Sequence, residues 1–533
     1  MFSVKEAESL SPFELGLFLE KSAKKAVKNS VPLNAGRGNP NWTAAAPREA
    51  FFLLGLFAVS EMERVRQGEL SGMPARIEML GRFEAFLEAQ NETPGKNLLT
   101  GIWEKGEQVL GVDKHDWLFE FVDAITGDNY PNPDRVLNYV EKAIKAYLKK
   151  EIFEGLEEPF DIFAVEGGTA GICYLFDSLV NNFLLQPGDK IALMIPTFTP
   201  YLEIPQLSRY RFDVVQIRST PELIDDRLTY QFSSREIEKL RDSSIKAVFM
   251  VNPSNPSSSA LKEETISKLV DIVENDNPEL MILTDDVYGT FVPKFQSVFS
   301  VLPFNTACIY SFSKYFGATG WRLGTIALAD ENVFDAKLRN LPQAFIRELE
   351  IRYEVITKET TNFKFIDRLV ADSREVALNH AAGLSTPQQV QMALFSLFSL
   401  LDEEESYKKK AQSICRYRQK LLYEELDLVM PFDHYDSAYY CEFDLLEWMK
   451  THFGEQFGLD FQRETSITNF LMRLALEQGL VLLKGSGFGG SEWSVRISLA
   501  NLETNDYKEI GRRIKKMVSD EFLKWQFERG QVK

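Results

Sequence analysis

The chain has 533 residues, of which 44% are hydrophobic and 26% are charged, a balance typical of soluble globular proteins with two or more domains. Its 60 basic and 78 acidic residues give a formal net charge of −18, which disfavours binding to nucleic acid or to an anionic membrane surface. No run of about 18 apolar residues occurs, so we expect no transmembrane helix.

The cysteines and histidines form no metal or disulfide pattern. Four cysteines are scattered without a CxxC pair, and the four histidines lie too far apart in the sequence for a metal motif. The first thirty residues are charged and amphipathic, without the apolar core of a signal peptide. We therefore expect no bound metal, and a location in the reducing cytoplasm.

The first quarter of the chain is predicted to be mostly helical. Residues 1–30 have the pattern of an amphipathic helix, and the loop VPLNAGRGNPNW follows at 31–42. Residues 50–125 also have a mainly helical pattern. The sequence TGDNYPNPDR at 126–135 predicts a second irregular loop.

Short apolar runs alternate with helical stretches from about residue 160 onward. Runs of this length, separated by helices, predict a largely parallel sheet that is covered on both faces. The runs are KIALMIP (190–196), IKAVFMVNP (245–253), LMILTDD (280–286), ACIYSFS (307–313) and LGTIALA (323–329).

The last part of the chain predicts a smaller α+β unit. A long helical stretch begins at about residue 385, and two strands are expected in GLVLLKGSGFG and WSVRISLAN. We predict an N-terminal arm and small-domain segment over 1–49, a large domain over 50–395 and a C-terminal small domain over 396–533. The helical segment at about 50–125 is then an insertion in the large domain.

Side chains with useful chemistry come directly after the apolar runs. Ligands of open α/β sheets bind outside the carboxyl ends of the strands, so these positions are candidates for a site. They include Phe198, Asn255, Asp285, Tyr288, Ser311 and Lys314, and the glycine-rich EGGTAG (166–171) opens a helix upstream of them.

The order and spacing of four elements, GGTAG, NPSNP (252–256), DDVY (285–288) and SFSK…R (311–322), resemble those of class I aminotransferases. The resemblance covers about residues 130–330 and the VRIS sequence near the C-terminus. It implies the α/β fold of the fold type I enzymes, with a mostly parallel seven-stranded sheet covered by helices and a smaller α+β domain. It also implies pyridoxal 5′-phosphate as the cofactor.

The resemblance assigns the reactive groups. Lys314 is expected to form a Schiff base with the aldehyde of the cofactor, and burial would favour its neutral amine; a solvated surface lysine is the alternative. Asp285 is expected to hold the pyridine nitrogen protonated. Tyr288 and Asn255 are expected to bond the phenolic oxygen of the cofactor, although Asn255 alone could be a turn residue before proline.

The phosphate of the cofactor is expected at the start of the helix that follows EGGTAG. The N–H groups of Gly168 and Thr169 would bind it there. The Ser311 hydroxyl and the planar fork of Arg322 would complete the site.

Three further side chains follow from the same resemblance. Phe198 is expected to stack on the pyridine ring, with ordinary core packing as the alternative. Tyr130 would reach the phosphate of a neighbouring subunit, which implies at least a dimer. Arg496 would pair with the α-carboxylate of an amino acid substrate.

The loop LNAGRGNPNW, the helical insertion and the full set of motifs resemble the aspartate 4-decarboxylases within this class. That resemblance implies conversion of L-aspartate to L-alanine and CO2, aspartate transamination as a side activity, small keto acids as further ligands, and a large homo-oligomer of dimers, a dodecamer. One alternative is an amino-acid aminotransferase that does not decarboxylate. Another is a non-catalytic domain that acts as a ligand sensor.

The residue that binds the β-carboxylate is the open point of this interpretation. Aspartate aminotransferases hold it with an arginine, whereas NHAAGLSTPQQ (379–389) has alanines at the comparable place. A weak clamp suits a decarboxylase, because a strong one would stabilise the ground state. Arg37, with its neighbour Gly36, is our first candidate, followed by Arg374 and His380; Arg37 could equally be an exposed loop arginine.

Overall fold

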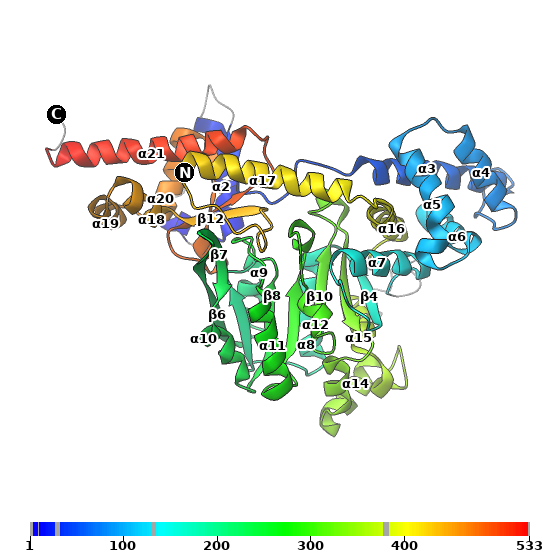
Figure 1. Ribbon diagram of the computed structural model, residues 1–533. Coiled ribbons are helices and arrows are strands. Elements are labelled where there is room, and N and C mark those ends of the chain that lie inside the picture. Colours follow the sequence, from blue (N-terminus) through cyan, green and yellow to red (C-terminus); the bar gives the residue numbers. More distant parts are fainter. Residues whose placement is uncertain (1–3, 9, 27–31, 129–134, 377–382, 531–533) are drawn as a thin grey trace.

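The computed structural model describes residues 4–8, 10–26, 32–128, 135–376 and 383–530. A large sheet with helices on both faces forms the centre of the molecule (Figure 1). The chain ends and the C-terminal helices form a smaller unit at one end, and the helices α3–α6 project at the opposite end.

The central sheet has the strand order β4-β11-β10-β9-β8-β5-β6-β7. Strands β8, β9, β10, β5 and β6 are parallel to their neighbours in this set, and β11 runs antiparallel to both β10 and β4. The strands are β4 (Phe160–Val165), β5 (Lys190–Ile195), β6 (Asp213–Ile224), β7 (Arg227–Phe232), β8 (Ile245–Val251), β9 (Met281–Asp285), β10 (Thr306–Ser311) and β11 (Gly324–Ala329).

The mostly parallel sheet agrees with the prediction, and the strand count differs by one. The first half of β6 pairs with β5 and completes seven strands, as expected. Its second half continues past the edge of β5 and pairs with β7 as an antiparallel hairpin. The hairpin was not predicted because its residues are largely polar and exposed.

The strands are continuous apolar runs in the sequence because successive side chains are buried on opposite faces of the sheet. In β8, Ala247, Phe249 and Val251 enter a cluster with the helices α8, α13, α14 and α15. Val248 and Met250 enter a second cluster with the helices α11 and α12 on the opposite face. Both faces of the sheet are therefore buried, as is usual for parallel sheets.

The helices of the large domain fall into the same two layers. Helices α8, α13, α14 and α15 cover one face, and α7, α11, α12 and α16 contribute to the clusters of the other. Their bounds are α7 (Asn138–Glu151), α8 (Gly168–Asn181), α9 (Thr199–Glu203), α10 (Ser234–Ile237), α11 (Glu263–Asn275), α12 (Val298–Val301), α13 (Val333–Arg339), α14 (Gln343–Tyr353), α15 (Phe365–Ser373) and α16 (Thr386–Leu401).

The predicted helical insertion consists of four helices and one small hairpin. The helices are α3 (Ala45–Arg64), α4 (Met79–Ala89), α5 (Pro94–Leu110) and α6 (Lys114–Thr126), and the hairpin joins β2 (Arg66–Gln67) to β3 (Leu70–Ser71). Helix α5 begins with a Thr93 side-chain cap and Pro94, and it ends at Gly111 with φ of 64°. These start and stop signals are readable in the sequence.

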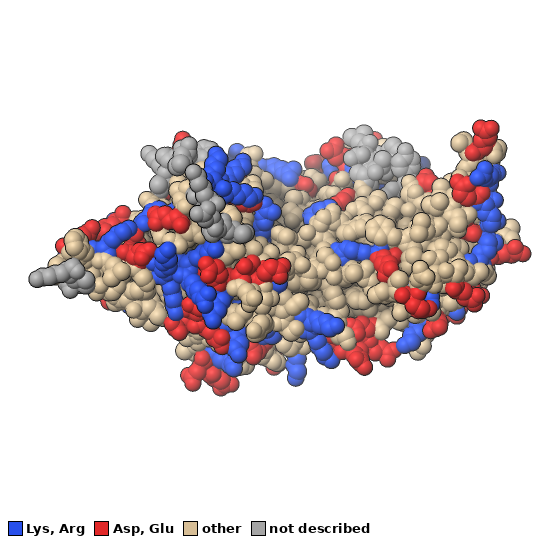
Figure 2. Space-filling model, turned by 90° about the horizontal axis from the view of Figure 1, so that it is seen from above, with Lys and Arg blue, Asp and Glu red and all other residues tan. Residues whose placement is uncertain are grey.

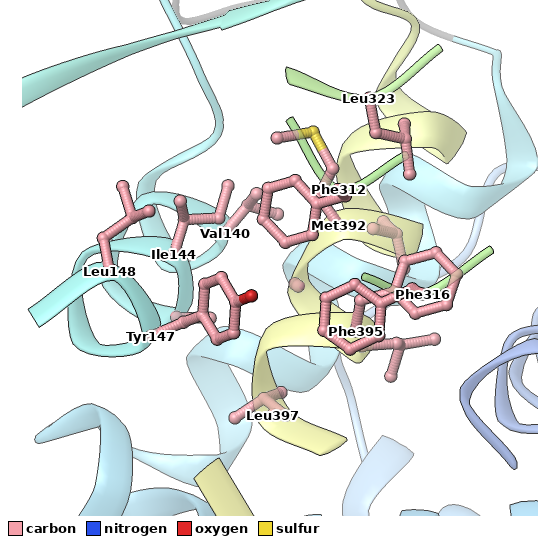
Figure 3. Packing of buried hydrophobic residues seen from close by; sticks show 14 of the residues in the cluster. Val140, Ile144, Tyr147, Leu148, Phe312, Phe316, Leu323, Met392, Phe395 and Leu397 are labelled. Atoms are coloured by element: carbon pink, nitrogen blue, oxygen red, sulfur yellow. The ribbon is translucent and has the colours of Figure 1, made fainter. Parts of the chain in front are cut away.

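A cluster of buried hydrophobic side chains packs α7 and α16 against the turn that follows β10 (Figure 3). Phe312 and Phe316, on either side of Lys314, are stacked with centroids 5.8 Å apart, and Phe316 lies 4.8 Å from Phe395 of α16. Tyr147 of α7 packs 5.4 Å from Phe312. The turn that carries Lys314 is therefore held on a rigid apolar base.

Both ends of the chain contribute to one hydrophobic cluster, which includes buried residues from Ala7 to Ala35 and from Leu422 to Val518. Strand β1 pairs with β13 in parallel. The elements here are α1 (Val4–Glu8), α2 (Pro12–Ala26), β1 (Leu33–Asn34), α17 (Ser406–Leu426), β12 (Tyr440–Asp444), α18 (Leu445–Phe453), α19 (Glu455–Glu464), α20 (Ile467–Gln478), β13 (Leu480–Val481), β14 (Leu483–Lys484), β15 (Ser494–Ser498) and α21 (Asp506–Glu528).

The predicted single helix over 1–30 is instead two helices. Ser11 and Glu14 form a reciprocal cap, in which each backbone N–H donates to the other side chain, and Pro12 opens α2. The exact domain boundaries stay predictions. None of the helices in the described part of the chain is both long and apolar enough to cross a membrane.

Candidate active site

A cavity of about 320 Å³ lies beside the carboxyl ends of β8, β9 and β10. Residues Gly38 and Asn39 of the N-terminal segment and Tyr440 of the small domain also line it. Among the predicted site residues, the structure brings into this cavity Gly168, Thr169, Phe198, Asn255, Asp285, Tyr288, Ser311, Lys314, Arg322 and Arg496.

Lys314 lies in the turn after β10 and points into the cavity. Its Nζ donates a hydrogen bond to the Gly38 carbonyl at 3.1 Å. Burial lowers the pKa of its ammonium group, and the positive charges of Arg496 and Arg322 act in the same direction. A larger share of neutral amine makes Lys314 a better nucleophile for an aldehyde.

Asp285 ends β9 and is 6% exposed. Its carboxylate accepts a hydrogen bond from the Val287 N–H at 3.3 Å and a long one from the Tyr201 hydroxyl at 3.5 Å. Burial, aided by the neighbouring Asp286, raises its pKa to about 7. Within the described residues no lysine or arginine forms an ion pair with it, so a protonated pyridine nitrogen is a fitting partner.

Asp286 points the other way and does not line the cavity. Its carboxylate accepts hydrogen bonds of 2.5 Å from the hydroxyls of Thr284 and Ser297. Burial raises its pKa to about 6. The two neighbouring aspartates therefore have different surroundings, and only Asp285 faces the site.

The phosphate end of the cavity is built from close backbone packing. Gly167 has φ of 91°, and a Cβ atom there would lie 2.6 Å from Arg322 Nη2. A Cβ atom on Gly324 would lie 2.8 Å from the Gly167 carbonyl carbon. Helix α8 begins directly after this turn, and the first N–H groups of a helix have no partner within it. A phosphate dianion fits this arrangement of amides and guanidinium.

Hydroxyl groups extend the same end of the cavity. Ser311 Oγ donates to Ser313 Oγ at 3.0 Å, and the Ser313 N–H donates back to Ser311 Oγ at 3.3 Å. Ser313 and Thr319 also line the cavity. The sequence prediction assigned only Ser311 to the phosphate, although Ser313 belongs to the same SFSK motif.

Arg496 is 1% exposed and lies between two aromatic rings. Its guanidinium carbon is 4.5 Å from the ring centre of Tyr440 and 4.6 Å from that of Phe488. Nη1 donates to Asn255 Oδ1 at 3.1 Å, and Nη2 donates to the Gly36 carbonyl at 2.6 Å. Nε has no hydrogen-bond partner among the described residues. A planar cation held in this way suits a carboxylate.

Two predicted candidates for the β-carboxylate lie elsewhere. Arg37 is 54% exposed in its side chain and donates to Glu20 at 2.8 Å, in a separate hollow beside α2. Arg374 follows α15, packs against Gly383 and does not line the cavity. Tyr130 and His380 lie outside the described residues. None of these four residues is therefore placed in the cavity.

Several lining residues were not predicted. Tyr440 hydrogen-bonds through its hydroxyl to Tyr288 at 2.9 Å, and Phe13 of α2 packs edge-on against Phe198 at 6.1 Å. Gly38 and Asn39 are in the loop that was singled out only for Arg37 and Gly36. No local pattern marks Phe13 or Tyr440, because tertiary packing alone brings them to the site.

A lysine with a lowered pKa, a buried unpaired carboxylate and a phosphate cradle, on this sheet, define a pyridoxal-phosphate-dependent enzyme of fold type I. Residues 128–514 match the family model for aminotransferase class I and II. The chain belongs to that family.

Sequence comparison extends the similarity beyond the family model. A bifunctional aspartate aminotransferase and L-aspartate beta-decarboxylase from Pseudomonas sp is 45% identical over 518 residues, which cover 96% of each chain. An aspartate aminotransferase from Sulfurisphaera tokodaii is 23% identical over 387 residues, which cover 70% of this chain and 80% of that one.

Solved structures show the same fold at lower identity. An aromatic aminotransferase from Pyrococcus horikoshii has a TM-score of 0.57 at 18% identity, covering 96% of this chain and all of that one. An N-succinyldiaminopimelate aminotransferase from Mycobacterium tuberculosis has a TM-score of 0.58 at 15% identity, covering 97% and 100%. Both matches support the predicted fold class.

Proposed function

We propose that this protein is a pyridoxal-phosphate-dependent enzyme that converts L-aspartate to L-alanine and CO2, with aspartate transamination as a second activity. The observation that carries the proposal is the 45% identity to the bifunctional relative over 96% of both chains. That alignment must include most of residues 1–127, which the general family model does not match. An aspartate aminotransferase without decarboxylation is the alternative.

Pyridoxal phosphate, when bound, supplies an aldehyde for amines and a ring that accepts electron pairs released at carbon. Arg322, the start of α8 and the two serines 311 and 313 would hold its phosphate. Asp285 would keep its ring nitrogen protonated, and Tyr288 with Asn255 would bond its phenolic oxygen.

Lys314 and Arg496 would act on the substrate together. Arg496, fixed by Asn255 and two aromatic rings, binds the α-carboxylate and so sets the orientation of Cα. The Lys314 amine takes the proton from Cα and later returns one to the same atom. The burial that lowers its pKa keeps this amine available as a base near neutral pH.

The β-carboxylate meets no arginine of its own in the described part of the cavity. The cations that line it are Lys314, Arg322 and Arg496, each with a different role. A loosely held β-carboxylate is less stabilised in the ground state, which favours its loss as CO2. Phe13 covers the cavity beside Phe198 and would limit the entry of the water that transamination requires.

Arg37 remains a candidate for selecting aspartate. Its neighbours Gly36 and Gly38 direct their carbonyls to Arg496 and Lys314, so its backbone lies at the site. Contact with a substrate requires the guanidinium to leave Glu20. We expect Arg37→Ala to raise KM for aspartate, and Glu20→Gln, which frees the arginine, to leave KM unchanged or lower it.

We also propose a homo-oligomer built from dimers, with a dodecamer as the expectation from the resemblance. Phe52, Leu56 and Val59 form one face of α3 and are 60%, 61% and 54% exposed. Uncharged residues occupy a broad area over the half of the molecule that carries α3–α6 (Figure 2). An apolar face of this kind supports burial against another subunit.

A cytoplasmic location is a further proposal. Its support is that all four cysteines, at positions 173, 308, 415 and 441, are free thiols in the structure. Free thiols suit a reducing compartment.

The proposed reaction is tested with L-aspartate as the sole substrate and with malate dehydrogenase and NADH present to remove oxaloacetate. The trap is needed because oxaloacetate loses CO2 by itself and would supply pyruvate for a return transamination to alanine. Alanine that still forms in step with CO2 supports direct decarboxylation. Malate without alanine would identify an aminotransferase.

A further inference from the structure

Tyr440 is a cavity residue without a role in the assignments above. It begins β12, is 2% exposed, and lines the cavity together with Lys314 and Arg496. Its hydroxyl lies 2.9 Å from the hydroxyl of Tyr288. A buried phenol beside the reactive lysine is a group that can give and take a proton.

The Tyr440 hydroxyl and the Lys314 amine both lie close to Gly38. A Cβ atom on Gly38 would lie 2.4 Å from Tyr440 Oη and 3.5 Å from Lys314 Nζ. The proton-carrying atoms of the two side chains are therefore on the same side of the cavity, next to Gly38.

The ring of Tyr440 is fixed by the residue that binds the α-carboxylate. The Arg496 guanidinium carbon lies 4.5 Å from the centre of this ring, which places the two in cation–π contact. Substrate held by Arg496 is thus held at a set position relative to the Tyr440 hydroxyl. The reacting carbons of a short amino acid bound by Arg496 and Lys314 would lie in the cavity that Tyr440 also lines.

We propose that Tyr440 donates the proton that Cβ receives after CO2 has left. The inference rests on the proposed decarboxylase function and names its general acid. The bond between Cβ and the carboxylate carbon breaks, and CO2 leaves without the electron pair. A C–H bond forms at Cβ as the O–H bond of Tyr440 breaks. Water finally restores the phenol, since the overall reaction consumes one proton.

Neighbouring groups are less suited to this step. Lys314 is engaged with the proton at Cα. Burial and the Tyr440 hydroxyl raise the pKa of Tyr288 well above its ordinary value, and its expected partner is the cofactor. Ser311 and Ser313 lie at the phosphate end, bonded to each other.

The test compares Tyr440→Phe with Tyr439→Phe in the holoenzyme. Tyr439 is a matched control, because it is equally buried, its hydroxyl donates to the Gly38 carbonyl at 2.9 Å, and it does not line the cavity. We expect Tyr440→Phe to lower alanine formation by about 100-fold or more, the usual contribution of a general acid. Conversion of aspartate to oxaloacetate in a single half-turnover should fall much less than alanine formation, because Lys314 is intact and takes the proton from Cα in both reactions.

A binding measurement separates the hydroxyl from the ring. 2-Methylaspartate has no proton at Cα and cannot react, so the absorbance of the bound cofactor reports its affinity alone. Tyr440→Phe keeps the ring over Arg496 and should bind this probe within about threefold of the wild type. Tyr440→Leu removes the ring and should bind about tenfold more weakly.

The outcomes distinguish the proposals. Alanine formation that falls no further than oxaloacetate formation in Tyr440→Phe overturns the role of Tyr440. An equal fall in Tyr439→Phe also overturns it, since the effect would then be structural. Wild-type enzyme that makes no alanine at all overturns the decarboxylase function itself.

Discussion

Two buried ionisable groups of the site are only partly satisfied by the described residues. Asp285 has a buried carboxylate with no ion-pair partner in the described part of the chain, and Arg496 has a buried Nε with no hydrogen bond there. Such groups destabilise a protein unless a ligand completes them. The groups that favour binding of a cofactor and a carboxylate substrate therefore lower the stability of the apoenzyme.

Asp285→Asn should change how apoenzyme stability depends on pH. The folded pKa of about 7 lies above the ordinary carboxyl pKa of 3.8, so the wild type loses stability as pH rises through this interval. From pH 6 to pH 8, both above the pI of about 5.0, the free energy of unfolding of the wild type should fall by about 1.4 kcal/mol more than that of the variant. This difference is the energy equivalent of one pKa unit. Urea unfolding at both pH values measures this difference. An equal change in the free energy of unfolding for wild type and variant would contradict the raised pKa of Asp285.

Arg496→Lys tests the fork geometry rather than the charge. Lysine keeps one positive charge but cannot bond a carboxylate through two parallel N–H groups. We expect KM for aspartate to rise roughly 10- to 100-fold, while the absorbance of the bound cofactor stays unchanged. An unchanged KM would show that another residue binds the α-carboxylate.

Motif residues of the site could be predicted, and residues brought in by packing could not. Lys314, Asp285 and Arg322 follow strands or turns whose sequence is readable, and the structure places them together. Tyr440 and Phe13 carry no local signal, because their positions depend on how distant elements meet. Arg37 was a candidate for binding the β-carboxylate because of the loop that contains it. Its side chain instead pairs with Glu20, which the sequence does not indicate.

At the scale of elements, the N-terminal segment is joined to the turn that carries Lys314. Ala44 N–H donates to the Phe316 carbonyl, and the Arg48 guanidinium donates to the carbonyls of Phe316 and Gly317. Gly317 has φ of 60°, and a Cβ atom there would lie 1.9 Å from the Trp42 carbonyl oxygen. The start of α3 therefore fixes the position of the reactive lysine.

Gly317→Ala should disrupt this junction. The left-handed backbone and the clash with Trp42 should together lower the free energy of unfolding by about 2 kcal/mol or more. Gly320→Ala is the matched control, because nothing lies within 4 Å of its Cβ position, and it should change stability by less than about 0.5 kcal/mol. Denaturant unfolding of both variants measures the difference. Similar unfolding midpoints for Gly317→Ala and Gly320→Ala would argue against a tight junction.

At the scale of the whole molecule, the cavity forms where three parts of the chain meet. The sheet supplies Lys314 and Asp285, the N-terminal segment supplies Gly38, and the small domain supplies Tyr440 and Arg496. The mostly parallel sheet was predictable from apolar runs, since buried parallel strands have a clear pattern. The hairpin β6–β7 and the split of the first helix were not, because polar residues and a capping pair determine them.

The assembly is tested on the apolar face of α3. Leu56→Asp places a charge in the proposed subunit contact and should lower the mass measured by light scattering. Leu223→Asp is the control, since Leu223 is equally exposed at 61% but lies on the β6–β7 hairpin. An unchanged mass for Leu56→Asp would exclude this face from the contact.

The central claim is tested most directly by counting turnovers on L-aspartate alone. Purified enzyme with pyridoxal phosphate is mixed with aspartate, malate dehydrogenase and NADH but no keto acid, and alanine and CO2 are measured per active site. The account predicts many equivalents of alanine, matched by CO2, and none from Lys314→Ala. A reaction that stops after one half-turnover, with the cofactor aminated and activity restored only by a keto acid, would contradict it.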